Sequence, residues 1–318
     1  MRIGLVVDSS CDLPESFIQN ENVTLLPISV RIGAAALADH RNEQATLEFL
    51  HSQIATRGAE AETTPFSVEQ IRDVFLRRLV IDYDYVFCLT MTQTRSQTYA
   101  NAVQASFSIL NEYREPRTAA GYSTPFSLRV IDTQNLFTAQ GIPAVEAARL
   151  RAQGETPLKM RERLEYLTQN TYGYMVVPDL YYLRARAQKK GDGARSVGFL
   201  TAALGTALDL KPIMRCYRGV AEPAAKVRGF DNAVKAMFDH AARRIADGKL
   251  LTPTLCLSYG GELAEMRSLP GYTRLRETCA DHGVEVFESV MSLTGMVNVG
   301  KGAVALGFAS EPHAFDVR

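Results

Sequence analysis

Short apolar runs alternate with amphipathic stretches along the first half of the chain. The apolar runs are Ile3–Val7, Val23–Val30, Tyr85–Leu89 and Leu128–Ile131. Their β-branched and leucine content is typical of strands that are buried on both faces of a parallel sheet. Between them, apolar residues recur at helical spacing after Ser67 and after Thr98. Strands that alternate with helices predict a parallel α/β sheet with right-handed crossovers.

Helix boundaries in this half carry recognisable capping residues. Ser67 is followed three residues later by Gln70, the spacing of a capping box. Gly154 stands where a helix with Ile142 and Val145 on its apolar face would end. Thr156 precedes Pro157, which predicts an N-cap and a proline at the first helical position of the next helix.

The pattern changes near residue 168, which predicts domains at residues 1–168 and 169–318. In the second part we expect strands over Tyr174–Val177, Lys211–Ile213, Thr254–Ser258 and Val284–Phe287. The expected helices cover Asp179–Gln188, Phe199–Leu208, Asp231–Asp247 and Tyr272–His282, and Gly219 marks a turn.

Composition narrows the class of protein. The chain has 318 residues, of which 46% are hydrophobic, and 35 Lys+Arg balance 35 Asp+Glu. This apolar fraction excludes a disordered chain, and the balanced charge argues against an extended nucleic-acid surface. The opening apolar run is too short for a signal peptide, and no stretch reaches the ~18 apolar residues of a membrane span. With five scattered cysteines and no C-x-x-C pair, we expect a soluble cytoplasmic protein.

The common metal and nucleotide motifs are absent from the sequence. The five histidines are spread singly, without the spacing of zinc ligands, so no metal site is expected. The first strand is not followed by G-x-G-x-x-G, and Gly300-Lys301-Gly302 lacks the other residues of a P-loop. Ser96 lies between Arg95 and Gln97 rather than in a G-x-S-x-G elbow.

Hydroxyl-rich segments follow or precede the predicted elements of the first half. They are Asp8-Ser9-Ser10, Glu62-Thr63-Thr64-Pro65 and Thr90–Thr98. In an open α/β sheet, ligands bind in the crevice outside the carboxyl ends of the strands. Hydroxyls at a helix N-terminus can bind an anion there. The alternative is that these residues only form caps and turns, which is the commonest use of Ser and Thr.

The order of several segments resembles the DegV family of fatty-acid-binding proteins. These segments are I-G-L-V-V-D-S-S-C-D-L-P (Ile3–Pro14), L-L-P-I-S-V (Leu25–Val30), T-T-P (Thr63–Pro65), S-Q-T-Y (Ser96–Tyr99), V-I-D-T (Val130–Thr133), L-D-L-K-P-I (Leu208–Ile213), K-V-R-G (Lys226–Gly229) and G-K-G-A-V-A-L-G-F (Gly300–Phe308). The similarity runs nearly end to end. Each segment is weak by itself, and the ordered set is more specific.

The resemblance implies two α/β domains, a Rossmann-like domain with a parallel sheet and a second domain with a mixed sheet. It implies a long-chain fatty acid between them as ligand, with no other cofactor. The role implied is to present the carboxylate to a separate ATP-dependent kinase, similar to dihydroxyacetone kinase, for phospholipid synthesis. The carboxylate would be bound by Thr63 or Thr64, Ser96 and Arg228 from the matching segments. Thr92 and Asn298, which lie close to such segments in the sequence, are further candidates.

The acyl chain would occupy an apolar tunnel in the second domain. The candidate tunnel residues are Phe199, Leu200, Leu204, Met291, Leu293 and Met296. Burial of each methylene group stabilises the complex by about 0.8 kcal/mol, before the costs of binding. Ordinary core packing is an equally good interpretation of each of these side chains.

The chain departs from the family pattern at several positions. Gln97 stands where the family usually has Gly, and Glu62 where Thr or Ser is common. Asn298 replaces the usual His, and Lys301 replaces a Pro. The longer basic segment Arg184–Arg195 replaces a Gly-Gly-Arg-Ile segment, which affects the expectation of kinase docking.

Two other functions fit the same residues. A hydrolase or acyltransferase could use Ser96 as nucleophile, and it would need a histidine or another base within hydrogen-bond reach of the hydroxyl. A protein of the same fold could instead bind another small carboxylate ligand, given Asn298, Lys301 and the altered basic segment. The leading hypothesis is a lipid carrier that is not itself an enzyme.

Overall fold

The first sheet of the protein contains four parallel strands. The computed structural model describes residues 1–52, 61–183 and 209–317. The strand order is β2-β1-β6-β7, with β1 (Ile3–Asp8), β2 (Thr24–Leu26), β6 (Tyr85–Thr90) and β7 (Ser127–Asp132). All six residues of β1 are buried, as expected for a central strand covered on both faces.

The second sheet has six strands of mixed direction. Its order is β10-β9-β8-β13-β11-β12, with β8 (Thr171–Val176), β9 (Leu210–Tyr217), β10 (Val220–Arg228), β11 (Thr254–Tyr259), β12 (Glu285–Val290) and β13 (Val304–Ala309). Only β11 and β12 are parallel among its neighbouring pairs. The predicted fold class is therefore confirmed, with a parallel first sheet and a mixed second sheet.

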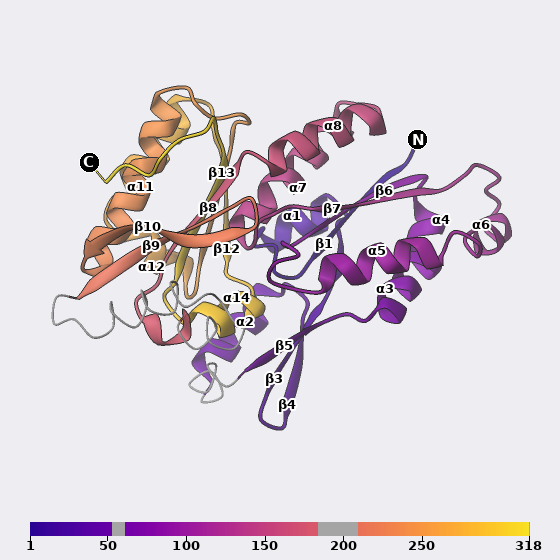
Figure 1. Ribbon diagram of the computed structural model, residues 1–318, viewed down its shortest axis with the longest axis horizontal. Helices are drawn as coiled ribbons and strands as arrows, with labels where there is room; N and C mark the ends of the chain where they lie inside the picture. Colours follow the sequence, from indigo (N-terminus) through magenta and orange to yellow (C-terminus); the bar gives the residue numbers. More distant parts are fainter. Residues whose placement is uncertain (53–60, 184–208, 318) are drawn as a thin grey trace.

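A third, antiparallel sheet was not predicted from the sequence. Its order is β4-β3-β5, with β3 (Ile28–Ile32), β4 (Ala35–Asp39) and β5 (Glu62–Pro65), and the β3–β4 hairpin projects from the body in Figure 1. The prediction of one strand over Val23–Val30 is wrong, because the run divides between β2 and β3 at Pro27. Proline has no N–H to donate to a sheet, so it favours the point where the chain leaves the first sheet.

Helices cover the sheets and connect their strands. In the first half they are α1 (Glu15–Asn20), α2 (Glu43–His51), α3 (Val68–Val74), a π-helical turn (Phe75–Leu79), α4 (Val80–Asp82), α5 (Thr98–Ser108), α6 (Arg114–Ala119), α7 (Thr138–Ala152) and α8 (Pro157–Thr168). In the second half they are α11 (Phe230–Ala246), α12 (Leu263–Arg267), α13 (Tyr272–Asp281) and α14 (Leu293–Val299).

The predicted caps are confirmed. Ser67 and Gln70 form the capping box of α3, and the Thr156 hydroxyl accepts the N–H of Lys159 at the start of α8. Gly154 adopts a φ of 75° just after α7, a conformation that glycine adopts without strain.

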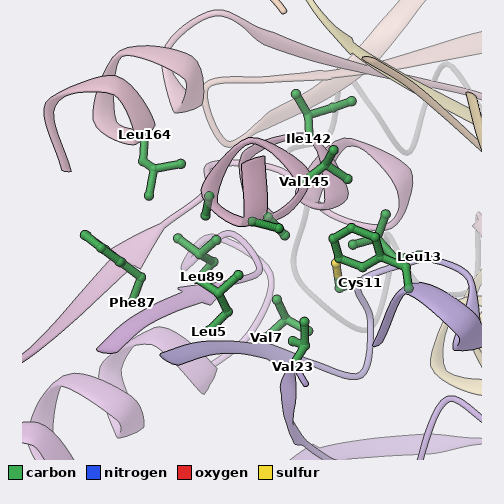
Figure 2. Close-up of a cluster of buried hydrophobic side chains, with 14 of the residues drawn as sticks. Leu5, Val7, Cys11, Leu13, Val23, Phe87, Leu89, Ile142, Val145 and Leu164 are labelled. Carbon is green, nitrogen blue, oxygen red and sulfur yellow. The ribbon is translucent and has the colours of Figure 1, made fainter. Parts of the chain in front are cut away.

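Helix α7 lies between the two large sheets. It packs against β1 and β6 on one side and against β8, β11 and β13 on the other (Figure 1). Every residue from Thr138 to Ala148 is buried. Figure 2 shows part of this core, where Leu5 and Leu89 of the first sheet lie below the helix that carries Ile142 and Val145. A helix that is buried all round in this way joins both halves into one structure.

The approach between α7 and the second sheet is close at Gly307 of β13. A Cβ atom at this position would lie 2.6 Å from the backbone N and Cα of Ala139. Only glycine permits this contact, because real Cβ atoms do not approach backbone atoms so closely.

A buried ion pair of the first half is hydrogen-bonded to the second half of the chain. Arg41 Nη1 lies 3.5 Å from Asp12 Oδ1, and both side chains are almost completely buried. Asp12 also accepts hydrogen bonds from the Ser258 hydroxyl at 2.7 Å and from the Ser292 N–H at 2.9 Å. Arg41 Nη2 donates to the carbonyl oxygens of Leu13, at 2.9 Å, and of Val290, at 3.1 Å.

Candidate ligand-binding site

A cavity of about 510 Å³ lies between the carboxyl edge of the first sheet and one face of the second. Ser10 follows β1, and the run Met91–Gln97 follows β6, so both reach the cavity from the carboxyl ends of parallel strands. This is the crevice where open α/β sheets bind their ligands. The volume falls within the range of small-molecule sites in proteins.

Most of the cavity wall is apolar. The apolar side chains in the wall are those of Ile28, Pro65, Met91, Leu136, Phe137, Met175, Leu183, Met214, Ala221, Pro223, Val299 and Ala305. Among the described residues that line the cavity there is no Asp or Glu, whereas Arg95 lies at its wall. A wall of this kind favours a ligand that combines a hydrocarbon portion with an anionic group.

The second sheet contributes side chains to this wall, because alternate side chains of a strand point to the same face of the sheet. Met214 and Cys216 of β9 line the cavity, whereas Tyr217 stacks on Tyr172 at a ring distance of 4.2 Å in the core on the other face. Cys216 is a free, buried thiol, and burial raises its pKa to about 12. These residues were not predicted from the sequence. The signal available in the sequence was the period-two alternation of side chains along β9.

Three of the expected carboxylate-binding residues reach the cavity. Thr63 of β5, Ser96 before α5 and Asn298 of α14 all line it. The Ser96 hydroxyl lies 2.8 Å from the hydroxyl of Thr98 and accepts the N–H of Thr98 at 3.2 Å. The Asn298 amide donates to the carbonyl oxygen of Thr294 at 2.6 Å, which fixes its orientation. Hydroxyls and an amide from separate elements thus face one space.

The other expected polar residues lie elsewhere. Thr64 is exposed on β5, where successive side chains alternate between the two faces of the strand. Thr92 is buried, and its hydroxyl lies 3.2 Å from that of Thr94, which does line the cavity. Arg228 is exposed at the end of β10 and is not among the described residues of the wall.

The expected tunnel residues are divided between described and undescribed parts of the chain. Met291 and Met296 belong to a buried cluster with Phe137 and Val299, two residues that line the cavity. Leu293 packs in a neighbouring cluster. Phe199, Leu200, Leu204 and the segment Arg184–Arg195 lie outside the described residues.

The tip of the β9–β10 hairpin is hydrogen-bonded to the loop after β6, which lines the cavity. The Thr94 hydroxyl donates to the carbonyl oxygen of Gly219 at 2.7 Å. The N–H of Gly219 donates to the carbonyl oxygen of Gln134 at 2.7 Å. Gly219 has a φ of 76°, which confirms the predicted turn. The loop after β6 is therefore bonded to the second sheet.

The described residues contain no group of three or more His, Cys, Asp or Glu side chains that could hold a metal ion. The hydrogen bonds of Ser96 within the described ranges are with Thr98, and none is with a histidine. No helix in the part of the chain that the structure describes has the length and apolar character to cross a membrane.

Comparison with known proteins gives consistent matches along the chain. A family model described as "Uncharacterised protein, DegV family" matches residues 2–311. A DegV domain-containing protein of Xanthomonas axonopodis pv. citri is 65% identical over 315 residues, covering 99% of both chains. A fatty acid-binding protein of Thermotoga maritima is 25% identical over 313 residues, covering 96% of this chain and 97% of the relative. The crystal structure of DegV, a fatty acid binding protein from Bacillus subtilis, matches with a TM-score of 0.75 at 19% identity, over 98% of this chain and 100% of that one.

Proposed function

The chain belongs to the DegV family, and from this membership and the cavity we propose that it binds a long-chain fatty acid. The acyl chain would lie along the apolar wall, and the carboxylate would be bound by Thr63, Ser96 and Asn298. The observation that carries the proposal is the composition of the wall, which is largely apolar, carries polar side chains from β5, the loop after β6 and α14, and is free of Asp and Glu among the described residues.

The energetics of such a complex are favourable. Burial of hydrocarbon contributes about 0.8 kcal/mol per methylene group, or more than ~10 kcal/mol for a 16-carbon chain before the costs of association. A buried carboxylate is costly unless it is paired or hydrogen-bonded. Hydrogen bonds to a charged group contribute about 1.5–3 kcal/mol each, so two hydroxyls and an amide offset much of that cost.

We further propose that the protein is a carrier rather than an enzyme. In this role it presents the bound carboxylate to a separate ATP-dependent fatty acid kinase for phospholipid synthesis. Gln93 and Gln97 beside Ser96 are exposed, which supports access of a partner to this end of the cavity. The five cysteines are free and buried, which supports a cytoplasmic location.

Lipid extraction followed by mass spectrometry tests the proposed ligand. We expect about one fatty acid for each purified chain. Recovery of a short polar acid would instead favour the alternative carboxylate ligand, and protein that stays empty when incubated with long-chain fatty acids would contradict the proposal.

A matched pair of threonine variants tests the proposed carboxylate contacts. Thr63→Val removes a hydroxyl from the cavity wall, whereas Thr64→Val removes one from the exposed position beside it. We expect T63V and Ser96→Ala each to weaken hexadecanoate binding by about 10- to 100-fold, because each removes a hydrogen bond to a charged group. T64V should bind like the wild type. Equal effects of T63V and T64V would contradict the assignment.

A further inference from the structure

A buried aspartate, Asp8, lies directly behind the cavity wall. It is the last residue of β1 and is fully buried. Its Oδ2 accepts the N–H of Met91 at 2.6 Å, and its Oδ1 accepts the N–H of Ser10 at 3.1 Å. Ser10 and Met91 both line the cavity, and Met91 begins the segment that carries Ser96. Asp8 therefore joins the segments after β1 and β6 at the point where both reach the cavity.

Gln140, near the start of α7, completes the contacts of Asp8. Its Nε2 donates to Asp8 Oδ2 at 3.0 Å and to the carbonyl oxygen of Leu89 at 3.2 Å. Because a backbone carbonyl oxygen only accepts, the contact with Leu89 fixes which end of the amide is nitrogen. The Gln140 Oε1 then lies 3.0 Å from the Ser10 Oγ, and that Oγ lies 2.5 Å from Asp8 Oδ1.

These three oxygens need one more proton than an ionised Asp8 provides. The Ser10 hydroxyl has a single hydrogen, but it contacts two oxygens that carry none if Asp8 is ionised, namely Asp8 Oδ1 and Gln140 Oε1. If Asp8 is a neutral acid, its O–H donates to Ser10 Oγ, and the Ser10 hydroxyl donates to Gln140 Oε1. Both contacts are then hydrogen bonds of ordinary length.

No cation is bonded to Asp8 among the described residues. Its hydrogen-bond partners are all neutral, and the neighbouring strand β2 has no titratable side chain. The nearby thiols are those of Cys88 on β6 and Cys11 after β1, and burial raises the pKa of both, so they are neutral. Asp12 differs, because it is paired with Arg41. Burial also raises the pKa of Asp8, as expected for an acid without a cation.

We propose that Asp8 is a positioning residue that holds a proton: as a neutral acid it fixes Ser10 and Met91 at the wall without placing a negative charge behind the bound carboxylate. This inference rests on the proposed function, because it takes the ligand to be an ionised fatty acid. Like charges in a site with little water disfavour each other, so an ionised Asp8 would oppose binding of the ligand. The neutral acid keeps the hydrogen bonds and avoids this repulsion.

Infrared spectroscopy at pH 7.5 tests the proton directly, because the C=O band of a neutral carboxylic acid is separate from the bands of carboxylates. Asp8→Asn removes the group, and Asp39→Asn is the matched control. Asp39 is also buried, but its contacts with the N–H and hydroxyl of Thr294 and the N–H of Arg41 are all with donors, so they need no extra proton. We expect an acid band that disappears in D8N and persists in D39N.

Hexadecanoate binding tests the positioning role. We expect D8N to bind within about threefold of the wild type, because its amide N–H can donate to Ser10 Oγ and its Oδ1 can accept the N–H of Met91. Asp8→Ala provides neither contact and should weaken binding by about tenfold. Thermal unfolding shows whether each variant is folded, and D8N carries the test by itself if D8A does not fold.

Two kinds of result would overturn the inference while leaving the proposed function intact. One is an acid band that persists in D8N, which would show that Asp8 is ionised in the wild type. The other is hexadecanoate binding that is unchanged in D8A, or that falls in D8N as far as in D8A. A wild-type protein that has the Asp8 band but binds no hexadecanoate would contradict the proposed function, and the role of Asp8 in binding with it.

Discussion

Replacing Arg41 with methionine removes the cation from a buried ion pair and leaves Asp12 without it. Both side chains are almost inaccessible to water, with 2% and 0% of their surfaces exposed. Methionine retains a long apolar side chain in the same space. Removing one partner of a buried pair typically costs about 3–5 kcal/mol, because the remaining charge is buried and uncompensated. Since the free energy of unfolding is about 5–15 kcal/mol for most proteins, R41M should be markedly less stable.

The loss of stability in R41M should depend on pH, and the ionisation of Asp12 sets the direction of that dependence. Burial raises the pKa of Asp12, and Arg41 is the first influence that opposes this rise. In R41M the pKa of Asp12 therefore rises further. A carboxyl group with a raised pKa in the folded state binds protons more readily there than in the unfolded chain, so it favours folding more as the pH falls. The difference in stability between R41M and the wild type should thus narrow from pH 7.5 to pH 5.5.

Urea denaturation at these two pH values measures the effect. The double variant Asp12→Asn/Arg41→Met supplies the control, because an asparagine can still accept the N–H of Ser292 without carrying a charge. We expect the double variant to recover at least about half of the stability that R41M loses. A loss below about 1 kcal/mol in R41M at pH 7.5, or a double variant less stable than R41M, would refute the reasoning.

Three further predictions follow from other contacts. Gly307→Ala should lower the free energy of unfolding by about 1–3 kcal/mol, because the new Cβ would lie 2.6 Å from backbone atoms of α7; denaturation that matches the wild type would contradict this. Burial lowers the pKa of His240 to about 3 and that of His313 to about 4, so the unfolded chain binds more protons below pH 6.5. The melting temperature should fall as the pH drops from 6.5 towards 4, and it should fall less in His240→Phe. If the melting temperatures of the variant and the wild type fall in parallel, the two histidines are not the cause of the fall. In Thr94→Cys/Gly219→Cys, a Cβ at the glycine would lie 3.4 Å from the threonine methyl group, so the two side chains would be in contact, although the φ of 76° strains a cysteine there. We expect oxidation to slow hexadecanoate release relative to the reduced protein, and equal rates would show that this side of the cavity does not open.

Local patterns predicted many elements correctly because the relevant forces act within a few residues. The capping box at Ser67 and the cap at Thr156 depend on hydrogen bonds to the next three residues, and both formed as expected. The run Ile3–Val7 predicted a buried strand, and β1 is that strand. The order of the segments shared with the family is a property of the sequence alone, and it identified the family.

The sequence predicted the residues of the cavity less well than it predicted the helices and strands, and the reason is geometric. The sequence placed Thr63 or Thr64 at the carboxylate without deciding between them, and Thr63 is the one that lines the cavity, because Thr64 lies on the exposed face of β5. It placed Arg228 there, but this residue is exposed at the end of β10, whereas Arg95 lies at the wall. Which side of a strand faces a ligand depends on pairing with other strands, and that pairing joins residues distant in the chain.

The sequence by itself determined the class of fold and the family, and it pointed to the segments after the first and third apolar runs, which line the cavity. Hydrophobic period, capping residues and turn glycines suffice for the class of fold, because each acts over short distances along the chain. The family followed from the ordered segments that resemble DegV proteins. Only the tertiary structure decided that α7 lies between two sheets, that Pro27 divides one apolar run between two of them, and that Arg41 pairs with Asp12. These features depend on burial against distant partners, and a buried charge or a shared helix is stable only where those partners meet.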